Sequence, residues 1–457
     1  MFTSRGAQPP TEAWRLREKR ITFSVVSGAV ATVIALGVLA RYGSGETAGV
    51  AIVGGPLFVL SWLGIRARFG TPATWRTGNV LILAAGIKIF VAPAVRALSA
   101  KSLYGGLADP RFYFLEGSVV ARWYWQGNIS LNGIEGVSTR AIGNNFVRAV
   151  GAVIAIVGEN ESAVYLVFSW FSFLGMWCFV EAFRVWASTW HLQRYAVAVC
   201  LLPSMLYWPS TAGKESWMVL WLGVWLLSFA YLTADGPRKL AGPLIGLVAA
   251  VFAITWIRPH MTLIAGLATM VALLATAASR RTAGSLVNVI VTLGISLPLV
   301  AFTVTAFKST FGGADSIDAA LQFTMDRTTS GNSTFAAQAV TNPLDFPGAF
   351  FSVVGRPFLW EASSIQMMVT AVEGLILLTY AGFVILRSPR HWLAPLRNPV
   401  GIWALVYLVV FVVAFSNVAN FGILARQRSM LWPVLLVLVV AAPKAVKMKP
   451  NSHSTPP

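Results

Sequence analysis

The chain has 457 residues, of which 56% are hydrophobic and only 11% are charged. An ordinary soluble domain carries roughly 25% charged residues, so this composition excludes a soluble multidomain enzyme, a disordered chain and a disulfide-stapled secreted protein. The two cysteines, Cys178 and Cys200, both lie in apolar runs and carry no information about the redox compartment.

Apolar runs recur along the whole chain at the length that a membrane-spanning helix requires. The sequence therefore predicts an all-α polytopic membrane protein of about 12 transmembrane helices. A basic segment, 1–20, precedes the first span and reads with it as an uncleaved anchor. Residues 21–446 are predicted to form a single transmembrane domain, and 447–457 a disordered cytoplasmic tail. The predicted spans are 21–40, 48–65, 79–98, 162–180, 195–212, 215–233, 240–257, 261–278, 285–306, 364–386, 399–419 and 429–446.

The distribution of lysine and arginine orients these spans. With the N-terminus in the cytoplasm, 20 of the 35 basic residues fall in cytoplasmic segments, whereas the outer segments carry 14 basic and 12 acidic residues. Such a bias places both termini in the cytoplasm. The net charge of +18 thus reflects mainly the basic residues of the predicted cytoplasmic segments. The sequence shows no soluble basic domain that would bind nucleic acid.

Two long outer loops are expected, at about 99–161 and 307–363. The apolar stretch 141–158 would invert the downstream topology if it crossed the membrane, so we expect it to lie outside as an interfacial or partly embedded helix. The aromatic stretch 111–126 is too strongly interrupted by charges to span.

Unusual polar residues gather at the outer ends of the spans. Pro203, Pro209 and Gly213 break the helix before Lys214 and Glu215, and Arg258 and His260 sit in a very short turn. Broken backbone at membrane depth is tolerated where it lines a polar cavity, and arginine suits phosphoryl oxygens. The alternatives are a tight hairpin with a snorkelling lysine, a structural histidine, and arginines that bind ordinary lipid headgroups. The predicted lipid-phosphate ligands are Lys214, Glu215, Arg258, His260, Arg356, Arg426 and Arg428.

Asp109 opens the first outer helix. Followed by Pro110, it is a good candidate for the N-cap of that helix. Its carboxylate is also the best-placed general base for a transferase, and the two roles are compatible. Glu116, two helical turns later, shares the same helix face and is the second catalytic candidate.

Asp109 with the helices near 111–126 and 141–158 resembles the GT-C superfamily of polytopic glycosyltransferases. The segment LPSMLYWPSTAGKES and the later Arg-Pro motifs are similar to bacterial membrane proteins of surface-polysaccharide clusters. The chain differs in placing its large loop after the third span and in lacking the family's paired acidic motif. The resemblance implies a catalytic carboxylate in the first outer loop and a sugar donor carried on polyprenyl phosphate.

The function expected from this resemblance is glycosyl transfer to a lipid-linked or cell-envelope glycan acceptor, at the outer face of the bacterial inner membrane. An O-antigen-polymerase or ligase type enzyme that uses lipid-pyrophosphate glycans, and a transporter or flippase of lipid-linked sugars, are the alternatives. The expected partners are the donor lipid, the glycan acceptor and membrane lipids. No cofactor is predicted, because the sequence has no Walker loop, no dinucleotide glycine pattern and no His/Cys metal spacing, and it lends no support to a divalent metal.

Overall fold

The computed structural model describes residues 45–104, 108–130, 134, 136, 138, 144–187, 189–234, 240–279, 333–387 and 393–440. Within these residues the protein is a bundle of helices, and an isolated β-bridge joins Thr334 to Asn420. The prediction of an all-α protein is confirmed. The predicted spans 21–40 and 285–306 lie outside the described residues.

The main helical segments of the described bundle are connected mostly by short turns. They are α2 (Gly45–Phe69), α3 (Trp75–Gly86), a π-helical turn (Ile87–Val91), α4 (Ala92–Tyr104), α5 (Asp109–Trp125), α7 (Asn145–Val157), α8 (Glu161–Arg184), α9 (Thr189–Leu201), α10 (Pro203–Tyr207), α11 (Lys214–Thr233), α12 (Ala241–Ile257), α13 (Pro259–Ser279), α16 (Phe346–Gly355), α17 (Ile365–Arg387), a 3-10 turn (Ala394–Arg397), α19 (Pro399–Phe415), α20 (Phe421–Gln427) and α21 (Trp432–Val440).

Six helices of the described residues are long and apolar enough to cross a membrane, and one of them, Trp75–Ser102, joins α3, the π-helical turn and α4. Their positions agree with predicted spans at 48–65, 79–98, 162–180, 215–233, 261–278 and 364–386. A seventh span results if α20 and α21, which bend by 55° at a short break, are taken together. The predicted spans 240–257 and 399–419 are helical but shorter, as α12 and α19. The predicted span 195–212 is wrong as one continuous helix, because α9 ends at Leu201. The protein is therefore a multi-pass membrane protein by the length and composition of its helices.

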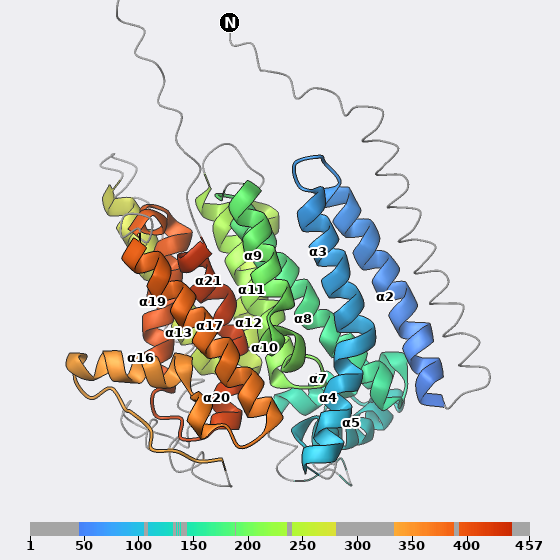
Figure 1. Cartoon of the computed structure of the whole chain (residues 1–457). Helices are drawn as coiled ribbons and strands as arrows, with labels where there is room; N and C mark the ends of the chain where they lie inside the picture. Colours follow the sequence, from blue (N-terminus) through green and yellow to red (C-terminus); the bar gives the residue numbers. More distant parts are fainter. Residues whose placement is uncertain are drawn as a thin grey trace, which may run out of the picture.

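The bundle has two distinct ends (Figure 1). The turn between α2 and α3 and the start of α9 lie at one end, and α5, α7, α16 and α20 gather at the other. The second group comes from the segments that the charge bias predicts to lie outside the membrane. Elements distant in the sequence are thus collected at one end of the bundle.

The stretch 141–158 forms α7, a helix of only 13 residues. At about 1.5 Å per residue this helix is too short to cross the hydrocarbon core of a bilayer. It packs against α5, with Tyr113 edge-on to Phe146 at 4.9 Å between ring centroids. Its length agrees with the prediction that this stretch does not span.

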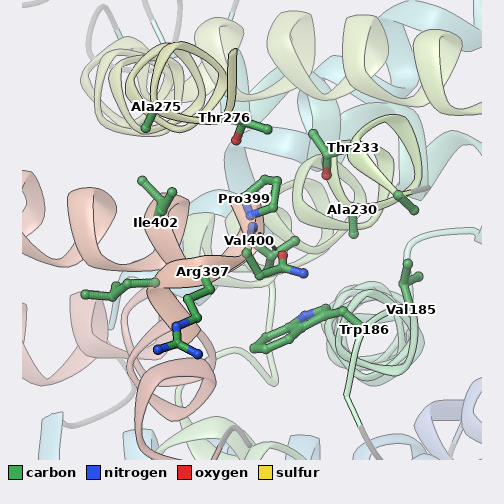
Figure 2. Close-up of a pocket in the computed structure, with 13 residues that line it drawn as sticks. Val185, Trp186, Ala230, Thr233, Ala275, Thr276, Arg397, Pro399, Val400 and Ile402 are labelled. Atoms are coloured by element: carbon green, nitrogen blue, oxygen red, sulfur yellow. Dashed lines mark hydrogen bonds between the residues drawn. The ribbon is translucent and has the colours of Figure 1, made fainter. Parts of the chain in front are cut away.

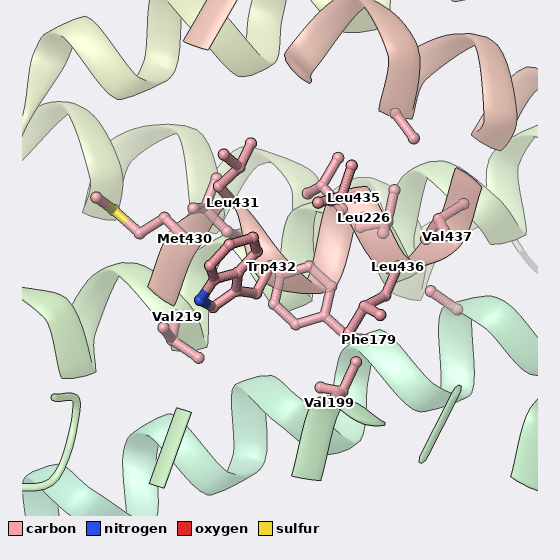
Figure 3. Packing of buried hydrophobic residues seen from close by; sticks show 14 of the residues in the cluster. Phe179, Val199, Val219, Leu226, Met430, Leu431, Trp432, Leu435, Leu436 and Val437 are labelled. Atoms are coloured by element: carbon pink, nitrogen blue, oxygen red, sulfur yellow. The ribbon is translucent and has the colours of Figure 1, made fainter. Parts of the chain in front are cut away.

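The centre of the bundle is α21, whose nine residues are all buried. Trp432 packs between Phe179 of α8 and Val219 of α11, while Leu436 faces Val199 of α9 (Figure 3). A helix that is apolar on every side is expected to be enclosed by other helices. Because α20 leads directly into α21, this core fixes the position of the arginines that precede it.

The contact between α8 and α11 depends on two glycines. A Cβ atom at Gly175 would lie 2.2 Å from the carbonyl oxygen of Val219, and one at Gly223 would lie 2.4 Å from that of Gly175. Small residues allow helix backbones to approach this closely. The two helices must separate if either glycine gains a side chain.

We expect Gly223→Ala to destabilise the protein by about 1–3 kcal/mol, the usual cost of overpacking. Gly382→Ala in α17 is the matched control, since a Cβ there meets nothing within 4 Å. The measurement is the melting temperature of the detergent-purified protein. Equal melting temperatures for the two variants would contradict the close packing of α8 on α11.

Candidate functional site

Asp109 stands at the start of α5, but it does not cap the helix as the sequence predicts. The helix begins at Asp109 itself, and Ala108 occupies the N-cap position without a side-chain hydrogen bond. The Asp109 carboxylate instead accepts a hydrogen bond from Arg426 Nη1 at 2.7 Å. The N-cap interpretation is therefore wrong, because this carboxylate is drawn to a cation on α20 rather than to the amides of its own first turn.

Asp109 is also accessible. Its side chain is 46% exposed, whereas the Arg426 side chain is 26% exposed. The pair combines a carboxylate that a ligand can reach with a guanidinium anchored in the bundle. The hydrogen bond from Arg426 holds this carboxylate in one orientation.

A second, buried ion pair lies beside the first. Arg258 donates to Glu215 at 2.8 Å, with side chains only 12% and 7% exposed. Arg258 also donates to Gln427, the neighbour of Arg426. The ends of α11, α12 and α20 are thus joined by charge-assisted hydrogen bonds, which are the stronger class in a low-dielectric setting.

Tyr113 and Lys214 complete this cluster. Tyr113 lies one turn after Asp109, and the Lys214 ammonium is 6.0 Å from the centre of its ring. Burial, with the negative charges of Asp109 and Glu215 nearby, raises the pKa of Tyr113 to about 12. The phenol is therefore neutral at physiological pH and keeps its proton to donate.

The predicted ligand His260 lies at the start of α13. Its ring is edge-on to Phe415 of α19 at 6.0 Å between centroids. This contact joins α13 to α19 beside the Arg258 turn. The structure thus gives His260 a packing role, which was the alternative interpretation of this residue.

Two of the predicted phosphate ligands, Arg356 and Arg428, belong to a separate group. Arg428 is fully buried and donates to the carbonyl oxygens of Val354 and Arg356. The Arg356 side chain lies 3.4 Å from Glu361 and 4.8 Å from the ring of Phe335. These contacts tie α16 to the start of α21, so the seven predicted ligands do not converge on one point.

Glu116 makes a contact away from the Asp109–Arg426 pair. Its carboxylate accepts a hydrogen bond from the backbone amide of Ser138 at 3.2 Å. The contact holds the loop that follows α5. Sharing a helix face with Asp109 therefore does not give Glu116 the same partners.

The helix break at 203–213 is confirmed, and a buried lysine holds it. Between α9 and α11 the chain forms only the short helix α10. Lys88 is fully buried in the π-helical turn, and its ammonium donates to the carbonyl oxygens of Met205 and Pro209 and to the Ser210 hydroxyl at 2.8–3.0 Å. The carbonyl groups freed by the break are satisfied by this charge. Lys88 thereby positions the segment that delivers Lys214 and Glu215.

Sequence analysis did not single out Tyr113, Gln427 or the function of Lys88. Tyr113 follows Asp109 at a spacing of four residues, which puts the two on one helix face. Lys88 was visible as an isolated charge inside a span, a feature that commonly marks a functional or structural requirement. Gln427 had no signal, because its partner Arg258 is distant in the sequence.

A cavity of about 510 Å³ lies at the opposite end of the bundle. Figure 2 shows Trp186, Thr233, Thr276, Arg397 and Val400 around it. None of the sequence-predicted site residues lines this cavity. Its walls come from segments predicted to face the cytoplasm, so it is spatially separate from the Asp109 cluster.

A metal centre finds no support in the described residues, where no group of three or more His, Cys, Asp or Glu side chains is arranged to hold a metal ion. The acidic side chains of the candidate site are instead paired with arginines. Comparisons with protein families, with curated proteins and with solved structures gave no match to this chain, so its assignment rests on its own residues.

Proposed function

We propose that the protein is a membrane glycosyltransferase that moves a sugar from a polyprenyl-phosphate donor to a lipid-linked or cell-envelope glycan acceptor on the outer face of the bacterial inner membrane. The observation that carries the proposal is the half-exposed carboxylate of Asp109, oriented by Arg426 at the end of the bundle where the interfacial helices gather. Lipid headgroups and glycan hydroxyls meet at this boundary.

In the proposed reaction the Asp109 carboxylate accepts the proton of an acceptor hydroxyl as the hydroxyl oxygen forms a bond to the anomeric carbon of the sugar. The bond between that carbon and the phosphate oxygen breaks, and the phosphate leaves with the electron pair. Cationic side chains offset the charge on the leaving group. The neutral phenol of Tyr113, close to Asp109, is a hydrogen-bond donor to either substrate.

Transfer on the outer face requires a defined topology. We propose twelve spans with both termini in the cytoplasm, so that the α2–α3 turn is cytoplasmic and the loop after α5 is external. The charge distribution of the sequence supports this orientation, as does the separation of these two segments to opposite ends of the bundle (Figure 1).

Cysteine labelling tests the orientation. In a variant that lacks Cys178 and Cys200, we expect Ser130→Cys to react with a membrane-impermeant maleimide added to intact cells. Thr71→Cys should react only after the membrane is opened. Both positions are exposed, so the labelling of Thr71→Cys alone in intact cells would invert the proposed topology.

The reaction itself can be tested with the purified protein in bilayer discs. The probes are hexosyl and pentosyl polyprenyl phosphates with a radiolabelled sugar, supplied with a glycan lipid extract as acceptor. We expect labelled glycan and free polyprenyl phosphate in equal amounts. A ladder of products from lipid-pyrophosphate glycans would identify a polymerase instead, and movement of the lipid between leaflets without any product would identify a transporter.

A further inference from the structure

A basic cavity adjoins the candidate catalytic carboxylate. It has a volume of about 330 Å³ and lies between α4, the start of α5 and the start of α8. Ala108 and Pro110, the sequence neighbours of Asp109, are both part of its wall. The cavity and the Asp109–Arg426 pair therefore share the first turn of α5.

Three cations line this cavity: Arg96, Lys101 and Arg111. Within the described part of the chain, none of the three is ion-paired with a carboxylate. This distinguishes them from Arg258, Arg356 and Arg426, whose charges are met by acidic side chains.

Arg96 is the buried cation of the cavity. The residue is only 5% exposed, and its guanidinium is stacked 4.9 Å from the ring centre of Tyr207 and 5.2 Å from that of Trp208. Among the described residues its Nε atom has no hydrogen-bond partner. A buried guanidinium with unused hydrogen-bonding capacity is costly unless a ligand satisfies it.

The two carboxylates in the wall are already engaged. Glu46 accepts a hydrogen bond from the backbone amide of Ser162 at 2.9 Å, and Glu161 accepts one from the hydroxyl of Tyr165 at 2.6 Å. Lys101 and Arg111 are exposed, so they reach the solvent side of the cavity while Arg96 lies at its buried side. This arrangement can surround a compact anion with cations from two directions.

We infer that this cavity binds a phosphate group, with Arg96, Lys101 and Arg111 as its ligands. The inference rests on the proposed function in one respect: it assigns the phosphate of the donor lipid to a place beside Asp109. The guanidinium groups suit phosphoryl oxygens through paired hydrogen bonds, and the lysine adds a point charge. The same chemistry would recognise free inorganic phosphate, and the two sources are separated by experiment.

Binding is measured with the full chain in bilayer discs of phosphatidylcholine. The probes are radiolabelled polyprenyl phosphate, the uncharged polyprenol and inorganic phosphate. We expect the polyprenyl phosphate to bind at least 10-fold more tightly than the polyprenol. Arg111→Gln and Lys101→Gln should each weaken its binding by about 10-fold, the scale of one lost charge-assisted hydrogen bond.

Arg122→Gln is the matched control, because Arg122 is an exposed cation on the same helix that is paired with Glu159 outside the cavity. It should leave the affinity unchanged. If inorganic phosphate displaces the lipid and shows the same dependence on Arg111, the phosphate site is supported with free phosphate as a ligand. Equal affinity of Arg111→Gln, Lys101→Gln and the control would overturn the inference.

These outcomes are distinct from the fate of the proposed function. If both variants still transfer sugar and bind the donor with unchanged affinity, the proposed transferase function holds and the inferred phosphate site is wrong. If polyprenyl phosphate binding depends on Arg111 but no sugar is transferred, the phosphate site holds and the proposed transferase function is wrong.

Discussion

Replacing Asp109 with asparagine is expected to reduce sugar transfer on the order of 100-fold or more while the protein still folds and inserts. A glycosyl acceptor hydroxyl is a poor nucleophile at neutral pH, so its proton must leave as the new bond forms. Loss of a general base typically costs a factor of 10² to 10⁴. Asparagine nearly matches the shape of aspartate and can still accept a hydrogen bond from Arg426, but it cannot take the proton.

The comparison variant is Glu159→Gln. Glu159, like Asp109, is a carboxylate paired with an arginine, here Arg122 at 2.6 Å, but it lies outside the candidate site. The Arg122 guanidinium lowers the pKa of Glu159, so this carboxylate is ionised at neutral pH. We expect near-normal transfer from this variant. The measurement is the initial rate of labelled glycan formation at saturating donor, normalised to folded protein.

One experimental result would contradict the catalytic assignment of Asp109. If Asp109→Asn retains near-normal transfer while Asp109→Ala lowers the yield of folded protein, the carboxylate serves only to hold Arg426 and α20 against α5. Asp109→Glu separates the two roles further, because it keeps the charge and the basicity but moves the carboxylate by one methylene. The oxygen of a general base must lie within about 2.6–3.2 Å of the hydroxyl oxygen whose proton it takes, so we expect Asp109→Glu to lose activity on that displacement.

Breaking the buried pair of Glu215 and Arg258 should have the largest effect on stability. Glu215→Ala leaves the Arg258 guanidinium buried with Gln427 as a neutral partner. Removal of one member of a buried ion pair typically costs about 3–5 kcal/mol. We expect a marked fall in the melting temperature of the detergent-purified protein and poor recovery from membranes.

The double variant Glu215→Leu with Arg258→Met tests whether the loss comes from the unpaired buried charge. Well-packed apolar residues can replace a buried ion pair at little cost to stability, so the double variant should recover much of what Glu215→Ala loses. It should remain inactive if Arg258 also serves the reaction. Glu159→Gln again provides the exposed comparison, with little change in melting temperature because solvent screens exposed pairs. A loss for Glu215→Ala no greater than for Glu159→Gln would contradict the buried network.

Much of the architecture could be predicted from local features of the sequence. The apolar runs predicted the six span-length helices, since the hydrocarbon thickness of a bilayer sets a length that can be read from the chain alone. Pro203, Pro209 and Gly213 predicted the break before α11, because proline and glycine act on the backbone where they stand. The concentration of polar residues at one end of the spans followed from the cost of burying charge in lipid.

The partners of those polar residues were decided by the tertiary structure. Asp109 meets Arg426 across 317 residues of sequence, and no local pattern encodes that distance. Arg426 and Arg428 are two positions apart on one helical segment, so their side chains leave it on nearly opposite sides. Arg426 reaches the carboxylate of Asp109, and Arg428 is buried against the carbonyl groups of Val354 and Arg356. Sequence analysis did not single out Arg96 or Arg111, and the packing of α4 and α5 on α8 makes them walls of one cavity. Helix length and backbone breaks depend on neighbouring residues, whereas ion pairing and cavity shape depend on which helices pack together.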